Sequence, residues 1–302
     1  MFNLWKYLLN PRELVGLFTF YSDTLSAAAI AQFDAEVKHA YQNAGLIRGT
    51  VRTRTGVVGS THRFPKMGKG TATARVTQTD VVPMNVAHTN ATATLTDWNA
   101  PEYTDIFDQA KVNFDERQEL ATTIAGAIGR REDQLILAAL DAASSTLTVA
   151  NDIGGTDSAM NTAKARRCKR LLDDRGGPPD DPRTMLVSAF GLEDMLGNTD
   201  VTSSDFNTVK ALVNGELNTW LGFKWVMMET RDEGGLVKDG SNDRTTFAYK
   251  KSSTGLAIGI DFKTEVNYIP EKTSWLSNGL FSAGAVAIDA FGIVEMVSRE
   301  SA

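Results

Sequence analysis

The stretch LIRGTVRTRTGVVGSTHRFPKMGKGTATARVTQT, residues 46–79, decides what kind of fold this chain adopts. It has few large apolar side chains, so it cannot bury much surface alone and is predicted to project from the body. Its Thr, Val and Gly content predicts two extended strands, joined by a tip at residues 64–70. Its cationic residues, which no aspartate or glutamate accompanies, are Arg48, Arg52, Arg54, Arg63, Lys66, Lys69 and Arg75.

The charge of this stretch requires an anionic partner. The 302-residue chain has a net charge of −6, and eight cations without an acid lie between residues 37 and 79, so the remaining residues carry −14. The partner is either a nucleic acid or the acidic surface of another copy. Phe64 is the only aromatic residue of residues 46–79, so stacking platforms for bases are missing. The acidic remainder would also repel DNA, which favours an intersubunit arm.

A long helix is predicted further along the chain, from residue 115 to about residue 143. Glu116 and Glu119 suit the positive end of its dipole, and Leu120, Ile124 and Ile128 mark one apolar face. About thirty residues at 1.5 Å each give roughly 45 Å. Gly126 and Gly129 indicate close packing or a slight bend at its middle.

Shorter elements fill the rest of the chain. Helices are predicted at residues 22–45, 158–174, 191–196 and 206–212, and a Gly- and Pro-rich turn at 176–182 is the best domain boundary. An extended segment is predicted at 81–98, ending at Asn99-Ala100-Pro101. Further strands are predicted at 185–187, 224–228, 245–249, 256–260, 264–269, 283–288 and 293–297. The class is therefore α+β.

The first twenty residues, MFNLWKYLLNPRELVGLFTF, are apolar but interrupted by charges and proline. Neither a signal peptide nor a transmembrane helix is expected from them, and no membrane partner is predicted. We interpret them as an N-terminal arm whose aromatic anchors seek a hydrophobic groove. These anchors are Phe2, Trp5, Phe18 and Phe20.

The sequence offers no recognisable catalytic, cofactor or metal site. His39, His62 and His88 are widely spaced, and the segment around Lys69 lacks the first glycine and the Ser or Thr of a phosphate loop. The single cysteine, Cys168, lies among cations that could lower its pKa, although a small residue on a helix face is the simpler interpretation. We therefore predict that the protein is not an enzyme and needs no cofactor.

The order of arm, basic hairpin, long helix, compact α/β region and returning strands resembles the major capsid protein of tailed double-stranded DNA bacteriophages. The match is closest to a podovirus-like capsid family, and the fold is shared with encapsulins and the herpesvirus capsid floor. The motifs that carry the resemblance are VKHAYQ (37–42), LIRGTVR (46–52), NFDERQ (113–118), LLDDRGGPP (171–179), GLED (191–194) and LGNTDVTSSD (196–205).

The resemblance implies an N-terminal arm and helix (1–45), an extended loop (46–80) and a peripheral domain (81–181) that contains the spine helix (115–143). An axial domain (182–260) and C-terminal strands returning to the peripheral domain (261–302) complete it. It also implies pentamers and hexamers of an icosahedral head in which the seven cations of residues 46–79 contact neighbouring subunits. Expected partners are a scaffolding protein, a portal protein, a decoration protein and packaged double-stranded DNA.

The implied location is the virion capsid, with assembly in the host cytoplasm. Two other functions stay open at this point. One is an encapsulin-type shell that encloses an enzyme cargo. The other is a nucleic-acid-binding protein that uses residues 46–79 directly.

Overall fold

The computed structural model describes residues 45–111, 116–143, 147–178, 180–198, 201, 219–231, 233 and 235–300. The predicted arm with Phe2, Trp5, Phe18 and Phe20, the helix at 22–45 and the helix at 206–212 lie outside these residues, apart from Gly45 at the end of the first helix. The helices, with short 3₁₀ turns labelled η, are η2 (Arg48–Thr50), α2 (Ile106–Gln109), α3 (Glu116–Ala143), α4 (Thr162–Asp174), α5 (Ala189–Leu196), η4 (Lys251–Ser253), η5 (Pro270–Lys272) and η6 (Ala290–Gly292).

The strands form three sheets. A long sheet has the order β1 (Arg52–Arg54), β10 (Thr254–Ile269), β11 (Ser274–Ala287) and β4 (Thr96–Asp105). A six-stranded sheet has the order β5 (Thr148–Val149), β12 (Ile293–Arg299), β9 (Asp243–Lys250), β6 (Arg183–Val187), β8 (Phe223–Met227) and β7 (Thr219–Trp220). The third sheet is a hairpin of β2 (Thr61–Met67) and β3 (His88–Thr94).

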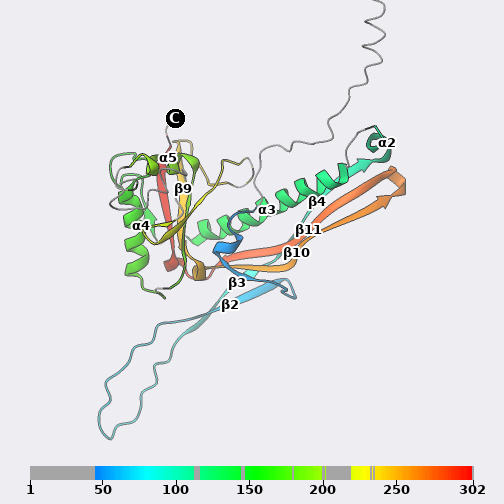
Figure 1. Ribbon diagram of the computed structural model, residues 1–302. Coiled ribbons are helices and arrows are strands. Elements are labelled where there is room, and N and C mark those ends of the chain that lie inside the picture. Colours follow the sequence, from blue (N-terminus) through cyan, green and yellow to red (C-terminus); the bar gives the residue numbers. More distant parts are fainter. Residues whose placement is uncertain are drawn as a thin grey trace, which may run out of the picture.

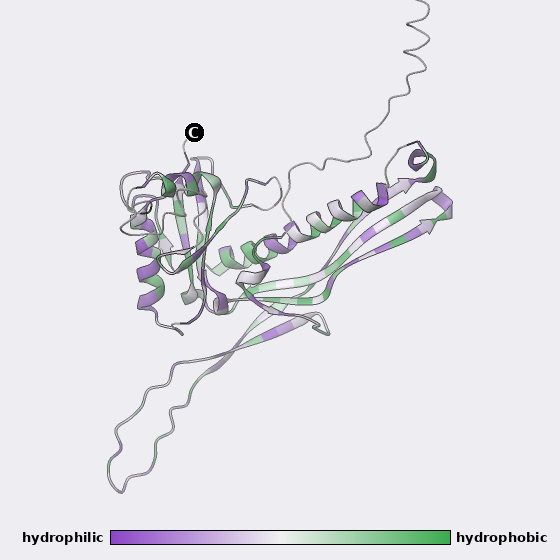
Figure 2. Ribbon diagram, in the orientation of Figure 1, coloured by the Kyte–Doolittle hydropathy of each residue, from purple (hydrophilic) through white to green (hydrophobic). Residues whose placement is uncertain are grey.

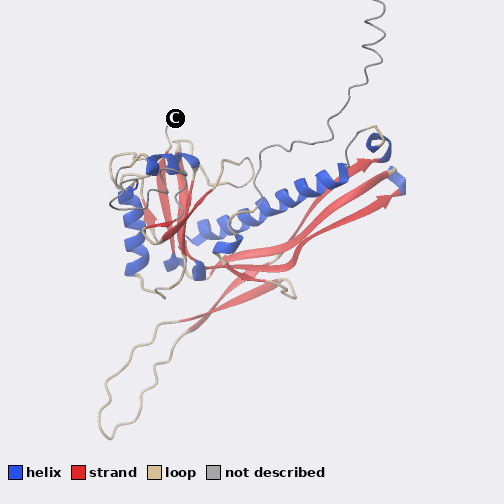
Figure 3. Ribbon diagram, in the orientation of Figure 1, coloured by secondary structure: helices blue, strands red, loops and turns tan. Residues whose placement is uncertain are grey.

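The molecule has one compact end and two extensions (Figure 1). The six-stranded sheet with α4 and α5 forms the compact end (Figure 3). The helix α3 lies along the long sheet, and both extend away from the compact end. The hairpin projects in another direction and ends in the loop of residues 68–87. This elongated shape leaves a large share of the chain outside any single core.

The long helix predicted at residues 115–143 is present as the spine helix α3, which has 28 residues. Ile124 and Ile128 are buried, as their four-residue spacing predicts, and Leu120 is half-buried. Gly45 allows the chain to approach the helix closely at Gly129, because a Cβ added at Gly45 would lie 3.0 Å from the Gly129 carbonyl oxygen. The helix packs chiefly on β11, where Gly279 makes room for Ile124.

The hairpin differs from the predicted one. The expected tip at residues 64–70 lies mostly inside β2, which pairs antiparallel with β3 from Thr61 opposite Thr94 to Met67 opposite His88. The first predicted strand belongs to another sheet, since β1 pairs in parallel with β10. The extended segment predicted at 81–98 begins as loop, and Pro101 lies within β4, which as an edge strand tolerates a proline.

The C-terminal region also differs from the predicted division. The boundary at residue 260 falls inside β10, whose two predicted strands are one strand with register shifts between Ile258 and Lys263. Of the three C-terminal strands β10, β11 and β12, only β10 and β11 belong to the long sheet. The final strand β12 returns to the six-stranded sheet beside β9, because its buried Ile293, Val294 and Met296 pack in the compact end.

Candidate subunit interface

The base of the extended region is tied to the spine helix by Asp133. This carboxylate is fully buried and accepts hydrogen bonds from the backbone N–H groups of Leu46 (3.0 Å) and Ile47 (3.1 Å). The Arg231 guanidinium donates to it at 2.9 Å and also to Glu229 at 2.6 Å. A buried carboxylate with three donors is well satisfied, so the chain leaves the body at a fixed point.

Arg48 forms a second tie at the same place. Its guanidinium binds Asp261 with two parallel hydrogen bonds of 3.0 and 2.7 Å and lies 3.4 Å from Glu132. The hydrogen bond from Arg48 lowers the pKa of the Asp261 carboxyl. Asp261 lies where β10 shifts register against β11, so the ion pair holds the strand at its bulge.

Phe64 attaches the hairpin to the long sheet. Its side chain is 2% exposed and packs with Ala93 of β3 and Ala257 of β10. A Cβ added at Gly255 would lie 2.7 Å from the ring, so glycine is needed there. The one aromatic residue of residues 46–79 is thus a structural anchor and is not offered to a base.

The structure separates the seven predicted contact cations into two groups. Three have contacts within the chain: Arg48 as above, Arg52 with its guanidinium 5.8 Å from the Phe64 ring centre, and Lys66 with Asp289 at 2.9 Å. The other four are exposed and form no ion pair with a described residue. These four are Arg54, Arg63, Lys69 and Arg75.

Exposed apolar side chains accompany the cations on the loop of residues 68–87. Val81 is 90% exposed and Val82 is 70% exposed, and Val76 and Met84 are also largely exposed. The sequence prediction missed them by placing Val81 and Val82 in a strand. Pro83 was the available signal against that strand, because proline interrupts strand pairing. An exposed group of this kind marks an interaction surface.

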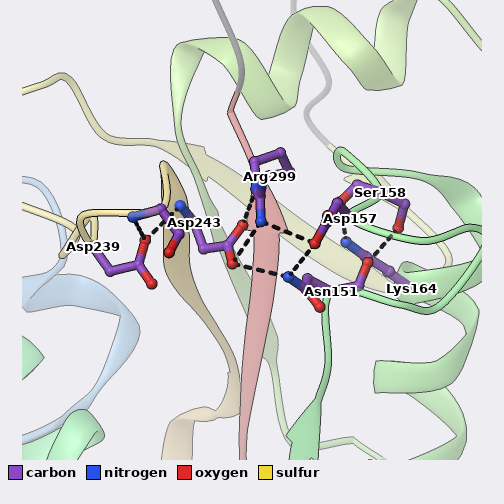
Figure 4. Close-up of polar contacts among 8 residues, drawn as sticks. Asn151, Asp157, Ser158, Lys164, Asp239, Asp243 and Arg299 are labelled. Carbon is purple, nitrogen blue, oxygen red and sulfur yellow. Dashed lines mark hydrogen bonds and ion pairs between the residues drawn. The ribbon is translucent and has the colours of Figure 1, made fainter.

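Polar contacts fix the edge of the compact end where β9 and β12 meet the loop before α4 (Figure 4). Arg299 donates to Asp243 at 2.5 Å and to Asp157 at 2.9 Å, and Asn151 donates to Asp243 at 2.9 Å. The Lys164 ammonium donates to the Ser158 carbonyl, and burial lowers the pKa of Lys164 to about 8. Every one of these groups is used in holding segments together, so the cluster is structural.

Cys168 is a small buried residue on a helix face, not an activated thiol. It is fully buried, its Sγ lies 3.8 Å from the Met296 Sδ, and burial raises the pKa of the thiol to about 12. The charge of the buried Lys164 lowers the thiol pKa, but the effect of burial is larger, so the thiol is not activated. Among the described residues, no group of three His, Cys, Asp or Glu side chains is arranged to hold a metal ion. None of the described helices is long and apolar enough to span a membrane.

Comparison with known proteins gives the geometry a context. The family model of the phage capsid protein matches residues 25–300, nearly the whole chain. This chain belongs to the phage capsid protein family. It is therefore a structural subunit of a phage shell, and the alternatives of an enzyme-enclosing shell or a free nucleic-acid-binding protein are not favoured. The family is structural, which agrees with the absence of a catalytic motif in the sequence.

Solved capsids share the fold of this family member. The capsid structure of the cyanophage P-SCSP1u is 16% identical, has a TM-score of 0.73 and covers 91% of this chain and 94% of its own. The head structure of Helicobacter pylori bacteriophage KHP40 is 11% identical, with a TM-score of 0.70 and coverages of 92% and 97%. The structure of Mycobacterium phage Che8 is 15% identical, has a TM-score of 0.66 and covers 87% of this chain and 95% of its own. A search of the curated proteins found no match.

These comparisons confirm the predicted family, the fold class and the function of a shell subunit in the virion capsid. The extended loop, the peripheral and axial domains and the intersubunit cations stay predictions at the level of individual residues.

Proposed function

We propose that this capsid subunit assembles as pentamers and hexamers of an icosahedral head that encloses double-stranded DNA, and that the loop of residues 68–87 grips the adjacent subunit. The loop carries exposed cations and exposed apolar residues side by side, and Asp80 is its only acid. That combination suits a protein surface, in which apolar contacts supply affinity and charges set the orientation. The acidic remainder of the chain offers the complementary charge.

The extended region has a fixed root and an exposed outer part, which supports this proposal. Asp133, Arg48 and Phe64 hold the root of the hairpin on its own subunit, which leaves the outer part available. Arg54, Arg63, Lys69 and Arg75 would then contact acids of a neighbour, together with Arg52 and Lys66 near the root. A single exposed ion pair contributes only about 0–1 kcal/mol, so the shell depends on many repeats of the contact.

Further partners follow from the same function. Assembly in the host cytoplasm would use a separate scaffolding protein and a portal protein, and the finished shell would offer its outer surface to a decoration protein. The aromatic residues Phe2, Trp5, Phe18 and Phe20 would anchor the arm in an apolar groove of the shell. The packaged DNA would contact the inner surface without sequence specificity.

Charge reversal on the hairpin strand β2 and on the loop of residues 68–87 tests the assembly role. The triple variant Arg63→Glu, Lys69→Glu and Arg75→Glu is expected to abolish closed particles in negative-stain microscopy, because like charges would face the acidic neighbour. Its thermal unfolding as a subunit should match the wild type, since all three side chains are exposed. The matched control reverses three exposed lysines on the body, Lys111, Lys224 and Lys263, and should assemble normally. Normal particles from the loop variant would refute the proposal.

A further inference from the structure

The helix α4 has an unusual charge pattern for a subunit with a net charge of −6. Its sequence TAKARRCKRLLDD places five cations between residues 164 and 170, and the first acid is Asp173. An acidic protein has no need of such a run for solubility. The positions of these side chains decide whether they can act together.

The helix divides sharply into an apolar and a cationic side. Ala165, Cys168 and Leu172 are fully buried against the six-stranded sheet. Arg166 and Arg170 are exposed, and residues four apart lie on one face of a helix. The helix is strongly hydrophilic along its length in Figure 2, in contrast to the strands that it covers.

The two acids at the end of α4, Asp173 and Asp174, do not cancel this charge. Asp173 is held by Arg183 at 2.6 Å and lies 3.5 Å from Lys169. The Arg183 hydrogen bond and charge lower the pKa of Asp173 against the opposing effect of desolvation, the largest single influence. Asp173 is thus paired, and the two acids of the helix stand against its five cations, so the charge of α4 stays positive.

The positive surface continues beyond the helix to the hairpin. The Arg175 guanidinium lies 4.9 Å from the centre of the Phe291 ring, and the Lys66 ammonium lies 6.0 Å from the same centre. Lys66 also pairs with Asp289 at 2.9 Å. Because Lys66 is already paired, we name only Arg166, Arg170 and Arg175 the basic ridge. Its length is roughly 14 Å, from about 1.5 Å per helical residue.

We propose that the basic ridge contacts the sugar–phosphate backbone of the packaged duplex, without reading its sequence. This inference rests on the proposed function, because it assumes that DNA is enclosed. Arginine matches phosphate oxygens with paired hydrogen bonds, and a line of cations suits a backbone with regularly spaced charges. The exposed side of α4 has no apolar residue to form the centre of a protein interface, in contrast to the valine-bearing loop of residues 68–87.

Salt-dependent retention of the purified full-length subunit on duplex DNA tests the proposal. The slope of log affinity against log salt falls by about 0.9 for each lost phosphate contact. The variant Arg166→Glu with Arg170→Glu should therefore lower the slope by about 2, and Arg166→Gln with Arg170→Gln should give a similar loss with less disturbance. Arg166→Lys with Arg170→Lys should keep the wild-type slope.

The matched control is Lys224→Glu with Lys263→Glu, which changes the net charge equally at exposed positions away from the ridge. It should keep the wild-type slope. An unchanged slope in the Arg166→Gln, Arg170→Gln variant, or a wild type without salt-dependent retention, overturns the proposal. Ridge-dependent retention on polyglutamate that exceeds retention on DNA would overturn it in favour of an acidic protein partner.

Microscopy of the same preparations separates this proposal from the assembly proposal. The Arg166→Gln, Arg170→Gln variant should form closed particles like the wild type, because the ridge lies outside the loop that is proposed to grip the neighbour. A wild type that forms no particles counts against the assembly proposal, and the DNA-retention slopes still decide the role of the ridge.

Discussion

Glu132 and Asp133 are neighbours on the spine helix, yet the structure treats their carboxylates differently. Asp133 accepts from two backbone N–H groups and Arg231, so its charge is fully paired. Glu132 is only 5% exposed and has Arg48 at 3.4 Å without a hydrogen bond to its Oε1. Burial raises the pKa of Glu132 to about 7, and the charge of Arg48 offsets only part of that effect.

This difference predicts a pH dependence of subunit stability. A carboxyl with a raised pKa takes up a proton on folding, so its effect on stability is most favourable at acidic pH. The free energy of unfolding should fall as the pH rises from about 4.5 to about 7, by on the order of 1–3 kcal/mol from this group. Glu132→Gln should flatten the profile of melting temperature between pH 5 and pH 8.

The control for this measurement is Glu271→Gln in the exposed turn η5, which should leave the profile unchanged. A Glu132→Gln variant that keeps the full wild-type pH dependence would show that another group is responsible. The measurement requires unassembled subunits, because intersubunit contacts would add their own pH dependence.

At the level of the elements, the crossing of the hairpin over the long sheet is the tightest place in the structure. Where β3 passes into β4, the Thr94 carbonyl oxygen would lie 2.0 Å from a Cβ added at Gly284 of β11. A Cβ added at the nearby Gly259 would lie 2.7 Å from the Leu95 side chain. Backbone atoms cannot move aside as a flexible side chain can, so glycine is required at Gly284.

Gly284→Ala should therefore destabilise the subunit by about 1–3 kcal/mol through overpacking. It should also shift the hairpin relative to the long sheet and lower the yield of closed particles. Chemical denaturation of the subunit measures the first effect, and microscopy measures the second. Gly240→Ala is the control, since nothing lies within 4 Å of its added Cβ. Equal stability of the two variants would contradict the steric clash expected between a Cβ at Gly284 and the Thr94 carbonyl oxygen.

The whole molecule is elongated, so much of its stabilisation in the shell must come from other copies. The loop of residues 68–87 lies at the far end of the hairpin, and α4 lies on the compact end (Figure 1). The former mixes cations with valines, and the latter carries the arginines of the basic ridge without an exposed apolar side chain. We infer that one subunit can thus contact a protein neighbour and a polyanion through separate surfaces.

Assembly through the loop should weaken at high ionic strength. Raising sodium chloride from about 0.1 to 1 M shortens the screening length from about 10 to 3 Å, so the particle yield measured by light scattering should drop. The neutral variant Arg63→Gln, Lys69→Gln and Arg75→Gln should start from a lower yield and show a flatter salt dependence. Equal salt dependence of the two proteins would mean that these cations do not contribute.

The sequence by itself determined the features that depend on nearby residues. The apolar spacing of Leu120, Ile124 and Ile128 placed the spine helix, and the acid-free run with its many glycines and threonines marked a projecting region. The motifs from VKHAYQ to LGNTDVTSSD were enough to indicate the family. Short-range periodicity and composition carry this information because helix faces and charge runs are local.

Only the tertiary structure decided which strands pair and which charges are already used. Alternation along residues 52–54 predicts a strand but cannot name β10, some 200 residues away, as its partner. Arg48 and Lys66 look as available in the sequence as Arg63 and Lys69, yet Asp261 and Asp289 occupy them. Sheet register and ion pairing depend on residues that folding brings together from distant parts of the chain. A local sequence pattern does not specify these long-range contacts.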